Sequence, residues 1–371
     1  MLGLPDRTDM FVIGGGPAGL AAAIAARRRG LDVIVADSAM PPIDKACGEG
    51  VTPEGIAAAR ALGIDLIAAG GHAFDGIRMC DAGAQTQAEF PSGAGLGIRR
   101  DKLHEFMAEI AADCGVRLVW GTRVAGIGAD GVQVSGRTVR SRWIVGADGG
   151  HSIVRRWAGL DASDRDSRRF GFRRHYRVAP WSPYMEIHWG DGCQLYVTPV
   201  AAEELCVVLI SRDQSLRLDE ALPRFTEVAA RLAGTEPIQW QRGAVTATRK
   251  LRSVYRGKVA LVGDASGSVD AITGAGLCLL FQQSSALADA LVAGDLSLYQ
   301  AAHRRIGRRP EWMADMMLLL DRRPGLRRRA LRAFADRPEL FAGMLGAHVG
   351  EFPISSLFTG GLSLAWQMMT V

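Results

Sequence analysis

Apolar positions at the start of the chain follow first the strand period and then the helix period. A short apolar run over Met10–Gly14 leads into a glycine turn, after which an alanine-rich helix is expected from Pro17 to about Arg29. The next run, Leu31–Asp37, is rich in β-branched residues, which favours a second strand. Strand, helix and strand in this order predict a parallel βαβ unit with a right-handed crossover.

The rest of the chain changes between strand-like and helix-like stretches. Short alternating segments separated by glycines over residues 73–97 and 166–249 predict antiparallel strands, with one helix near Leu222–Leu232. Everything after Leu298 is expected to be helical except the tail. Single elements are expected as helices over Pro53–Leu62, Asp101–Cys114 and Gly276–Val292, and as strands over Arg117–Trp120, Trp143–Val145 and Val259–Val262.

A glycine motif, Gly14-Gly15-Gly16-Pro17-Ala18-Gly19, fills the turn of the βαβ unit. Gly14 permits the tight turn, Gly16 lets the backbone approach a pyrophosphate, and Gly19 allows the helix to pack closely on the sheet. Free N–H groups at the helix N-terminus would bind the phosphate. Asp37 stands where a carboxylate accepts hydrogen bonds from a ribose. The motif predicts dinucleotide binding but does not separate FAD from NAD.

A second string, Trp143–Arg155, lies in the middle of the chain. Its apolar strand runs into Gly146-Ala147-Asp148-Gly149-Gly150, and a helix is expected to begin near Ser152, with Arg155 in its first turn. A capped helix after a tight turn explains the glycines and the serine, but not the whole string.

A third string, Gly257–Ala265, continues through Thr273–Leu277. Asp264 supplies a carboxylate at the end of a strand. The glycine-rich start of the next helix can stabilise negative charge on a ligand, because a helix N-terminus carries partial positive charge.

In their order and approximate spacing, the three strings resemble the signatures of the class A flavoprotein monooxygenases and geranylgeranyl reductases over about residues 8–300. The resemblance implies a fold like para-hydroxybenzoate hydroxylase and non-covalent FAD. Because no second GxGxxG motif stands elsewhere, NAD(P)H would dock transiently as the electron donor. The FAD-binding residues that the motifs and the resemblance imply are Gly14, Gly16, Gly19, Asp37, Arg100, Asp148, Gly149, Arg155, Gly263, Asp264, Gly274 and Gly276.

The expected fold class is mixed α/β, with the FAD signatures at the beginning, middle and end of the chain and β-rich stretches between them. A Rossmann-like FAD-binding domain is expected to be discontinuous, over residues 1–72, 98–165 and 250–300. An antiparallel β-sheet substrate domain, residues 73–97 and 166–249, would interrupt it. Residues 301–371 would form a C-terminal helical segment.

The reaction type has alternatives. Oxygen insertion into a lipophilic small molecule is the first expectation, because hydroxylases are the more numerous members of the superfamily. The loop Lys45–Gly50 is similar to the Cys-Gly-x-Gly loop of the geranylgeranyl reductases, and Tyr196–Pro199 is similar to a degraded form of their lipid-pocket motif. The second expectation is therefore a saturase that transfers hydride from FAD to a double bond, with Cys47 as a candidate catalytic residue in positioning the substrate or supplying a proton. A non-catalytic, flavin-bound protein at a membrane surface is the third.

The net charge of +5 is modest but unevenly distributed. Arginine clusters gather in Arg304–Arg337, next to the apolar run Met316–Leu320. A solvated helix face and peripheral contact with an anionic membrane both fit this pattern, whereas no recognised motif indicates nucleic-acid binding. The uncharged stretch Phe352–Val371 contains Pro353 and two adjacent glycines, and is expected to be a packed tail or an interfacial segment, not a membrane span.

Cysteine usage bears on location and on metal binding. The six cysteines are scattered without CxxC spacing, which argues against a structural zinc site. A chain with this much apolar sequence needs no disulfides, so a reduced, cytoplasmic protein is expected and no metal ligands are assigned.

Overall fold

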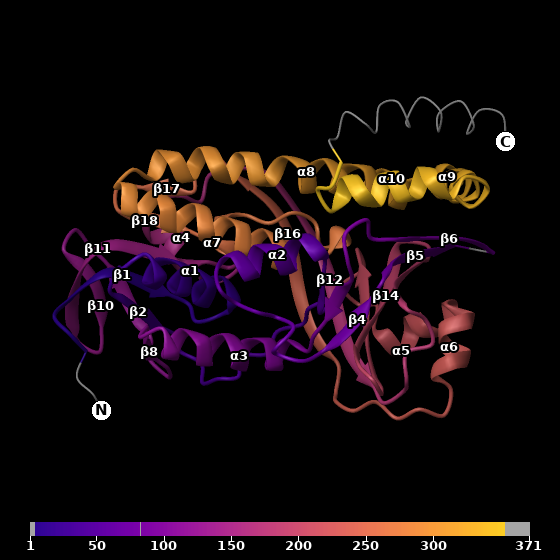
Figure 1. The fold of residues 1–371 in the computed structure, drawn as a ribbon, viewed down its shortest axis with the longest axis horizontal. Coiled ribbons are helices and arrows are strands. Elements are labelled where there is room, and N and C mark those ends of the chain that lie inside the picture. The colour runs from indigo at the N-terminus through magenta and orange to yellow at the C-terminus, as the bar shows by residue number, and fades with distance from the viewer. Residues whose placement is uncertain (1–3, 82, 353–371) are drawn as a thin grey trace.

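The computed structural model describes residues 4–81 and 83–352, whose strands form three sheets (Figure 1). The first is an eight-stranded sheet with a parallel centre. Its central strands, in spatial order, are β18 (Val259–Leu261), β11 (Arg137–Gly146), β1 (Arg7–Ile13), β2 (Val33–Ala36) and β8 (Arg117–Val119). The antiparallel strands β17 (Tyr255–Arg256), β10 (Gly131–Val134) and β9 (Val124–Ile127) extend it.

Helices pack on this sheet because their buried residues are small or apolar. The helix α1 (Pro17–Arg28) buries a run of alanines, which allows close approach, and it contacts both α3 (Arg100–Asp113) and α7 (Gly276–Ala293). By length and composition α7 could cross a membrane, but it packs against α1, α2 (Pro53–Ala61) and α8 (Leu296–Arg322) in the core. The predicted βαβ unit is also observed, because β1 and β2 pair in parallel and α1 connects them.

The second sheet has seven strands, in the order β16 (Arg242–Leu251), β12 (Ser163–Tyr176), β15 (Glu204–Ser211), β14 (Cys193–Ala201), β13 (Tyr184–Trp189), β5 (Gly76–Asp81) and β6 (Ala84–Glu89). We call it the large sheet. All its pairs are antiparallel, as expected, except β5 with β13, which are parallel from Gly76 to Cys80. No hairpin joins these two strands, so chain connectivity does not force them to be antiparallel.

A third, three-stranded sheet joins β3 (Gly50–Val51), β7 (Gly95–Gly97) and β4 (His72–Phe74). Of these strands, β3 belongs to the stretch expected to bind FAD, whereas β7 and most of β4 belong to the stretch expected to bind substrate. The two stretches therefore share a small sheet beside the loop that precedes β3.

The two faces of the large sheet bury different partners, as the two-residue period of a strand requires. On one face, Leu195 and Val207 share a core with the helices α5 (Leu218–Ala221) and α6 (Thr226–Leu232). On the opposite face, Tyr196 packs in a core shared with the C-terminal helices.

Three C-terminal helices cover that opposite face (Figure 1). They are α8, α9 (Pro324–Asp336) and α10 (Pro338–His348). Their apolar residues, among them Met317, Leu331 and Phe341, join one core with the sheet. The segment expected to be helical is therefore helical as far as the end of α10, and the tail from residue 353 on lies outside the described residues.

Not every arginine of this segment faces solvent. Arg327 of α9 is 2% exposed, and its Nε lies 2.7 Å from Oδ2 of Asp81 on β5. Its guanidinium also lies 5.3 Å from the centre of the Trp189 ring. Arg309 of α8 pairs with Glu54 at the start of α2. These two pairs fix the C-terminal helices to other parts of the chain.

We expect Arg327→Met to lower the free energy of unfolding by about 3–5 kcal/mol, because it leaves the buried Asp81 carboxylate without its cation. Urea denaturation followed by circular dichroism measures this change. Arg328→Met, at an exposed position of the same helix, should change the free energy of unfolding by about 0.5 kcal/mol or less. Equal losses in the two variants would contradict the assignment.

Candidate active site

A cavity of about 460 Å³ opens where the parallel strands of the eight-stranded sheet end. Ligands bind at the carboxyl ends of strands in open α/β sheets, where the turns expose helix N-termini. The walls come from the turns after β1, β2, β11 and β18, from the loop before β3 and from the first turns of α7. The residues expected from the sequence that line this cavity are Gly14, Gly16, Asp37, Cys47, Arg100, Asp148, Gly149, Gly263, Asp264 and Gly276.

The glycines of the first motif differ in what surrounds them. Gly14 has φ +111°, and a Cβ there would lie 2.4 Å from the carbonyl oxygen of Ala147. A Cβ on Gly19 would lie 1.9 Å from the carbonyl oxygen of Gly14, so Gly19 serves helix packing, and it does not line the cavity. A Cβ on Gly16 would meet no protein atom within 4 Å. The space above Gly16 is thus open to a ligand.

Asp37 holds the glycine turn in place. Its Oδ2 accepts a hydrogen bond from the backbone N of Gly15 at 2.7 Å, and its Oδ1 accepts one from Ala39 at 2.8 Å. Each oxygen keeps a lone pair that a ribose hydroxyl could use. On the other side of the turn, Nε2 of the buried His104 lies 2.9 Å from the carbonyl oxygen of Gly15. Burial lowers the pKa of His104, which favours the neutral ring with Nε2–H as the donor.

Asp148 caps the short helix α4 (Ile153–Trp157). Its Oδ2 accepts hydrogen bonds from the backbone N of Ile153 at 2.7 Å and of Val154 at 3.1 Å. Ser152 adds a second cap, because its hydroxyl accepts from the backbone N of Arg155. The other carboxylate oxygen of Asp148, Oδ1, is buried and has no hydrogen-bond partner among the described residues.

Arg155 lies behind the cavity wall and does not line it. Its side chain is 2% exposed and donates hydrogen bonds to Asp161 Oδ1 and to the carbonyl oxygens of Ala265 and Gly150. It therefore ties the second string to the third. Gly274 does not line the cavity either, but it ends a 3-10 turn with φ +64°, a conformation that favours glycine.

Asp264, the carboxylate of the third string, forms an ion pair with Lys45 in the cavity wall. Asp264 Oδ2 lies 3.0 Å from Nζ of Lys45, and both side chains are about half exposed. Behind them, the backbone N of Gly263 donates to Oε1 of Gln283 at 3.0 Å. The motif thus meets the loop that carries Cys47.

The residues around the cavity fit FAD. The open space above Gly16 lies at the N-terminus of α1, where backbone N–H groups have no helical partner. Two buried polar atoms, Oδ1 of Asp148 and Nε of Arg100, have no hydrogen-bond partner among the described residues. Both residues line the cavity, so a polar ligand bound there can supply these partners.

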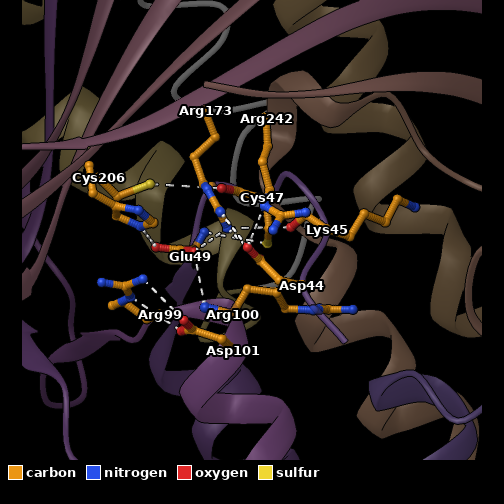
Figure 2. A network of polar contacts seen from close by, with 12 residues as sticks. Asp44, Lys45, Cys47, Glu49, Arg99, Arg100, Asp101, Arg173, Cys206 and Arg242 are labelled. Carbon is orange, nitrogen blue, oxygen red and sulfur yellow. Dashed lines mark hydrogen bonds and ion pairs between the residues drawn. The ribbon is translucent and has the colours of Figure 1, made fainter. Parts of the chain in front are cut away.

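A buried carboxylate holds the loop of Cys47 (Figure 2). Glu49 is 1% exposed and has φ +60°, an uncommon conformation for a residue with a side chain. Its Oε1 accepts from Nη1 of Arg173 at 2.7 Å and from the backbone N of Arg100 at 3.0 Å. Its Oε2 lies 2.7 Å from Nε2 of His175. The loop is therefore bound both to β12 and to the start of α3.

A second carboxylate completes the same network (Figure 2). Both Asp44 oxygens lie 2.8 Å from Arg173, a bidentate pair, and Oδ2 lies 2.8 Å from Nε of Arg242. Burial opposes ionisation of Asp44, but the hydrogen bond and charge of Arg173 and the charge of Arg242 hold its pKa below the ordinary value. Arg173 thus binds two carboxylates of one loop.

Cys47 itself is partly buried and lines the cavity. Its Sγ accepts a weak hydrogen bond from the backbone N of Glu49 at 3.4 Å, and its carbonyl oxygen accepts from Sγ of Cys206 at 3.8 Å. The thiol therefore shares a cavity with the three glycine-rich strings. A catalytic role for Cys47 stays a prediction.

The string Tyr196–Pro199 has a role in positioning loops. The hydroxyl of Tyr196 donates to the carbonyl oxygen of Ile272 at 2.7 Å, and Thr198 donates to the carbonyl oxygen of Gly48 at 2.9 Å. Both side chains project from the same face of β14 and are buried. One strand thus holds the loop before α7 and the loop of Cys47.

The groups that hold these loops were not foreseen from the sequence, and they are Glu49, Arg173, His175, Arg169 and Asp270. One signal was present: Arg169 and Arg173 stand four residues apart in a strand-like stretch, which places both arginines on one face. Their acidic partners gave no signal, because they stand far away in the sequence.

Comparison with known proteins supports FAD as the cofactor. The model of the family described as FAD binding domain matches residues 7–295. A menaquinone reductase of Mycobacterium tuberculosis is 26% identical, over 80% of this chain and 79% of that protein. A digeranylgeranylglycerophospholipid reductase of Methanothermobacter thermautotrophicus is 28% identical, over 83% and 82%. A rifampicin monooxygenase of Rhodococcus hoagii is 27% identical, over 81% and 68%.

The fold is also shared with solved structures. A flavoprotein/dehydrogenase from Cytophaga hutchinsonii superposes with a TM-score of 0.79, at 18% identity, over 92% of each chain. At this identity the likeness bears on the fold alone.

We expect Gly16→Ala to raise the dissociation constant for FAD at least tenfold, about 1.4 kcal/mol, because its methyl group enters the open space above the turn. Flavin fluorescence quenching measures the affinity. The apoprotein should unfold at the same urea concentration as before, since the methyl group meets no protein atom within 4 Å. Gly343→Ala in α10, which meets none either, is the control. Unchanged FAD affinity in Gly16→Ala would contradict the assignment.

Proposed function

The chain belongs to the FAD binding domain family and is an FAD-dependent oxidoreductase, and from this premise we propose that it reduces a carbon–carbon double bond of a lipophilic, isoprenoid-like substrate. The observation that carries the proposal is the position of Cys47, whose loop lines the cavity together with the three FAD strings. Relatives named as reductases of lipid and quinone compounds support this choice over oxygen insertion.

Reduction of a double bond needs a hydride at one carbon and a proton at the other. Bound and reduced, FAD supplies the hydride. We propose that the Cys47 thiol supplies the proton. This thiol is partly buried, and its Sγ accepts a weak hydrogen bond from the backbone N of Glu49. The ion pairs of Arg173 with the buried Glu49 and the partly buried Asp44 hold that loop in place, so the thiol is positioned before substrate binds.

Hydroxylation is the second candidate, and it was the first expectation from the sequence. A rifampicin monooxygenase among the relatives favours it. In that case the cavity has to exclude water and hold the substrate near FAD, and the Cys47 loop would be part of the wall. NAD(P)H is the electron donor that we propose for both reactions.

We expect Cys47→Ser to bind FAD as the unchanged protein does but to reduce the double bond at least tenfold more slowly, because a hydroxyl is a weaker proton donor than a thiol. Stopped-flow oxidation of the reduced flavin by geranylgeranyl diphosphate, without oxygen, gives the rate. Cys80→Ser is the matched control, since burial raises the pKa of the Cys80 thiol to about 12 and the residue does not line the cavity.

The mass of the product separates the two candidates. Reduction adds two hydrogen atoms and proceeds without oxygen, whereas hydroxylation adds one oxygen atom and requires oxygen. A product that gains oxygen, with full activity of Cys47→Ser, would overturn the reductase proposal in favour of the hydroxylase.

We further propose that the protein is cytoplasmic and contacts anionic membranes peripherally through part of the segment Arg304–Arg337. The segment is not uniformly basic, because Asp336 of α9 is an exposed carboxylate. Much of the apolar run Met316–Leu320 is not available to lipid, because Met317 and Leu318 are buried against the large sheet. Charge therefore supplies most of the attraction. The exposed arginines at the end of α8 and along α9 are Arg322, Arg323, Arg328, Arg329 and Arg332.

We expect Arg328→Glu with Arg329→Glu to weaken binding to phosphatidylglycerol vesicles at least tenfold, since each basic residue near an anionic surface contributes about 1 kcal/mol. Vesicle sedimentation at low salt measures binding. Arg60→Glu with Lys102→Glu, which reverses two exposed charges on α2 and α3, is the matched control. Equal binding by both double variants would remove the membrane proposal.

A further inference from the structure

A second buried charge network lies at the junction of the large sheet, α8 and the loop before α7. Arg169 of β12 is 3% exposed, and its Nη2 lies 2.8 Å from Oδ2 of Asp321 at the end of α8. Its Nε lies 3.2 Å from the carboxylate of Asp270. Gln194 of β14 accepts from Nη1 of Arg169 at 3.1 Å and donates to Asp321. From these contacts we propose that Arg169 is a positioning residue, which fixes the N-terminus of α7 against bound FAD.

The network pairs two carboxylates with two cations, and of these four groups only Arg212 reaches solvent. Asp270 and Asp321 are each 3% exposed, and Arg212, about half exposed, adds a second cation 3.0 Å from Asp321. Burying ion pairs gains little stability over apolar packing of the same volume. Such a network fixes the orientation of the groups in it, because a guanidinium binds its partners in a fixed plane.

Asp270 connects the Arg169 network to the cavity wall through hydrogen bonds. Its Oδ1 accepts from the backbone N of Ile272 at 3.1 Å, and its carbonyl oxygen accepts from the hydroxyl of Thr273 at 3.1 Å. Thr248 of β16 donates to Oδ2 at 3.2 Å. Only two residues then separate this turn from Gly276, the first residue of α7, which lines the cavity. The chain between the network and the cavity thus has little freedom.

The position of α7 matters because its N-terminus carries partial positive charge. Gly276, Leu277 and Leu280 lie in the cavity wall. Reduction adds negative charge to the flavin, so a helix N-terminus held close to it stabilises the reduced form. A looser Arg169 network would weaken this stabilisation. The inference rests on FAD binding and holds for either of the proposed reactions.

Arg169→Lys and Arg327→Lys form a matched pair for the experiment. Each replaces one buried arginine and so weakens an ion pair that joins the large sheet to a C-terminal helix. In the holoenzyme, we expect Arg169→Lys to raise the dissociation constant for FAD at least tenfold and to shift the flavin midpoint potential to a more negative value. Arg327→Lys should lower the urea midpoint of unfolding, but keep the FAD dissociation constant within twofold and the potential unchanged.

Asp270→Asn provides a second variant if Arg169→Lys does not fold. Its amide oxygen can still accept from Ile272, so the turn is kept, while the ion pair with Arg169 is lost. It should shift the midpoint potential in the same direction. An unchanged potential and FAD affinity in Asp270→Asn, or in a folded Arg169→Lys, would overturn the proposal and leave the network a structural role only.

Discussion

Burial of two carboxylates on one face of the large sheet is the constraint on which the site depends. Glu49 belongs to the loop before β3 and Asp270 to the loop before α7, and each is nearly inaccessible to solvent. Arg173 binds the first and Arg169 the second, from positions four residues apart on the same face of β12. Because a buried carboxylate without a cation is strongly destabilised, neither loop can leave its place without breaking an ion pair.

The two halves of the molecule therefore have separate tasks in forming one site. The eight-stranded sheet supplies the turns where glycines and helix N-termini can receive a dinucleotide, and these turns depend on local sequence. The large sheet determines where the loop of Cys47 and the N-terminus of α7 lie, through its arginines and through Tyr196 and Thr198. A change in the large sheet can thus alter the cofactor's surroundings without touching a cofactor-binding motif.

The same division explains how much could be predicted from sequence. The βαβ unit, the mixed α/β class and the lining positions Gly16, Asp148 and Asp264 come from contiguous strings with a local physical meaning. The pair Glu49–Arg173 spans 124 residues and Arg169–Asp270 spans 101, and no local pattern links such partners. The parallel pairing of β5 with β13 was missed for a similar reason, since the strands stand far apart in the sequence.

The order of strands in the eight-stranded sheet has a consequence for how the protein is made. The neighbours β1, β11 and β18 come from the beginning, middle and last third of the chain. During synthesis the N-terminal βαβ unit emerges first, but the wall formed by Asp264 and Gly276 is added only after the whole large sheet has been translated. A growing chain that has not yet reached Gly276 therefore lacks part of the wall of the FAD site, and the complete site exists only once the N-terminal unit and the large sheet have both been synthesised.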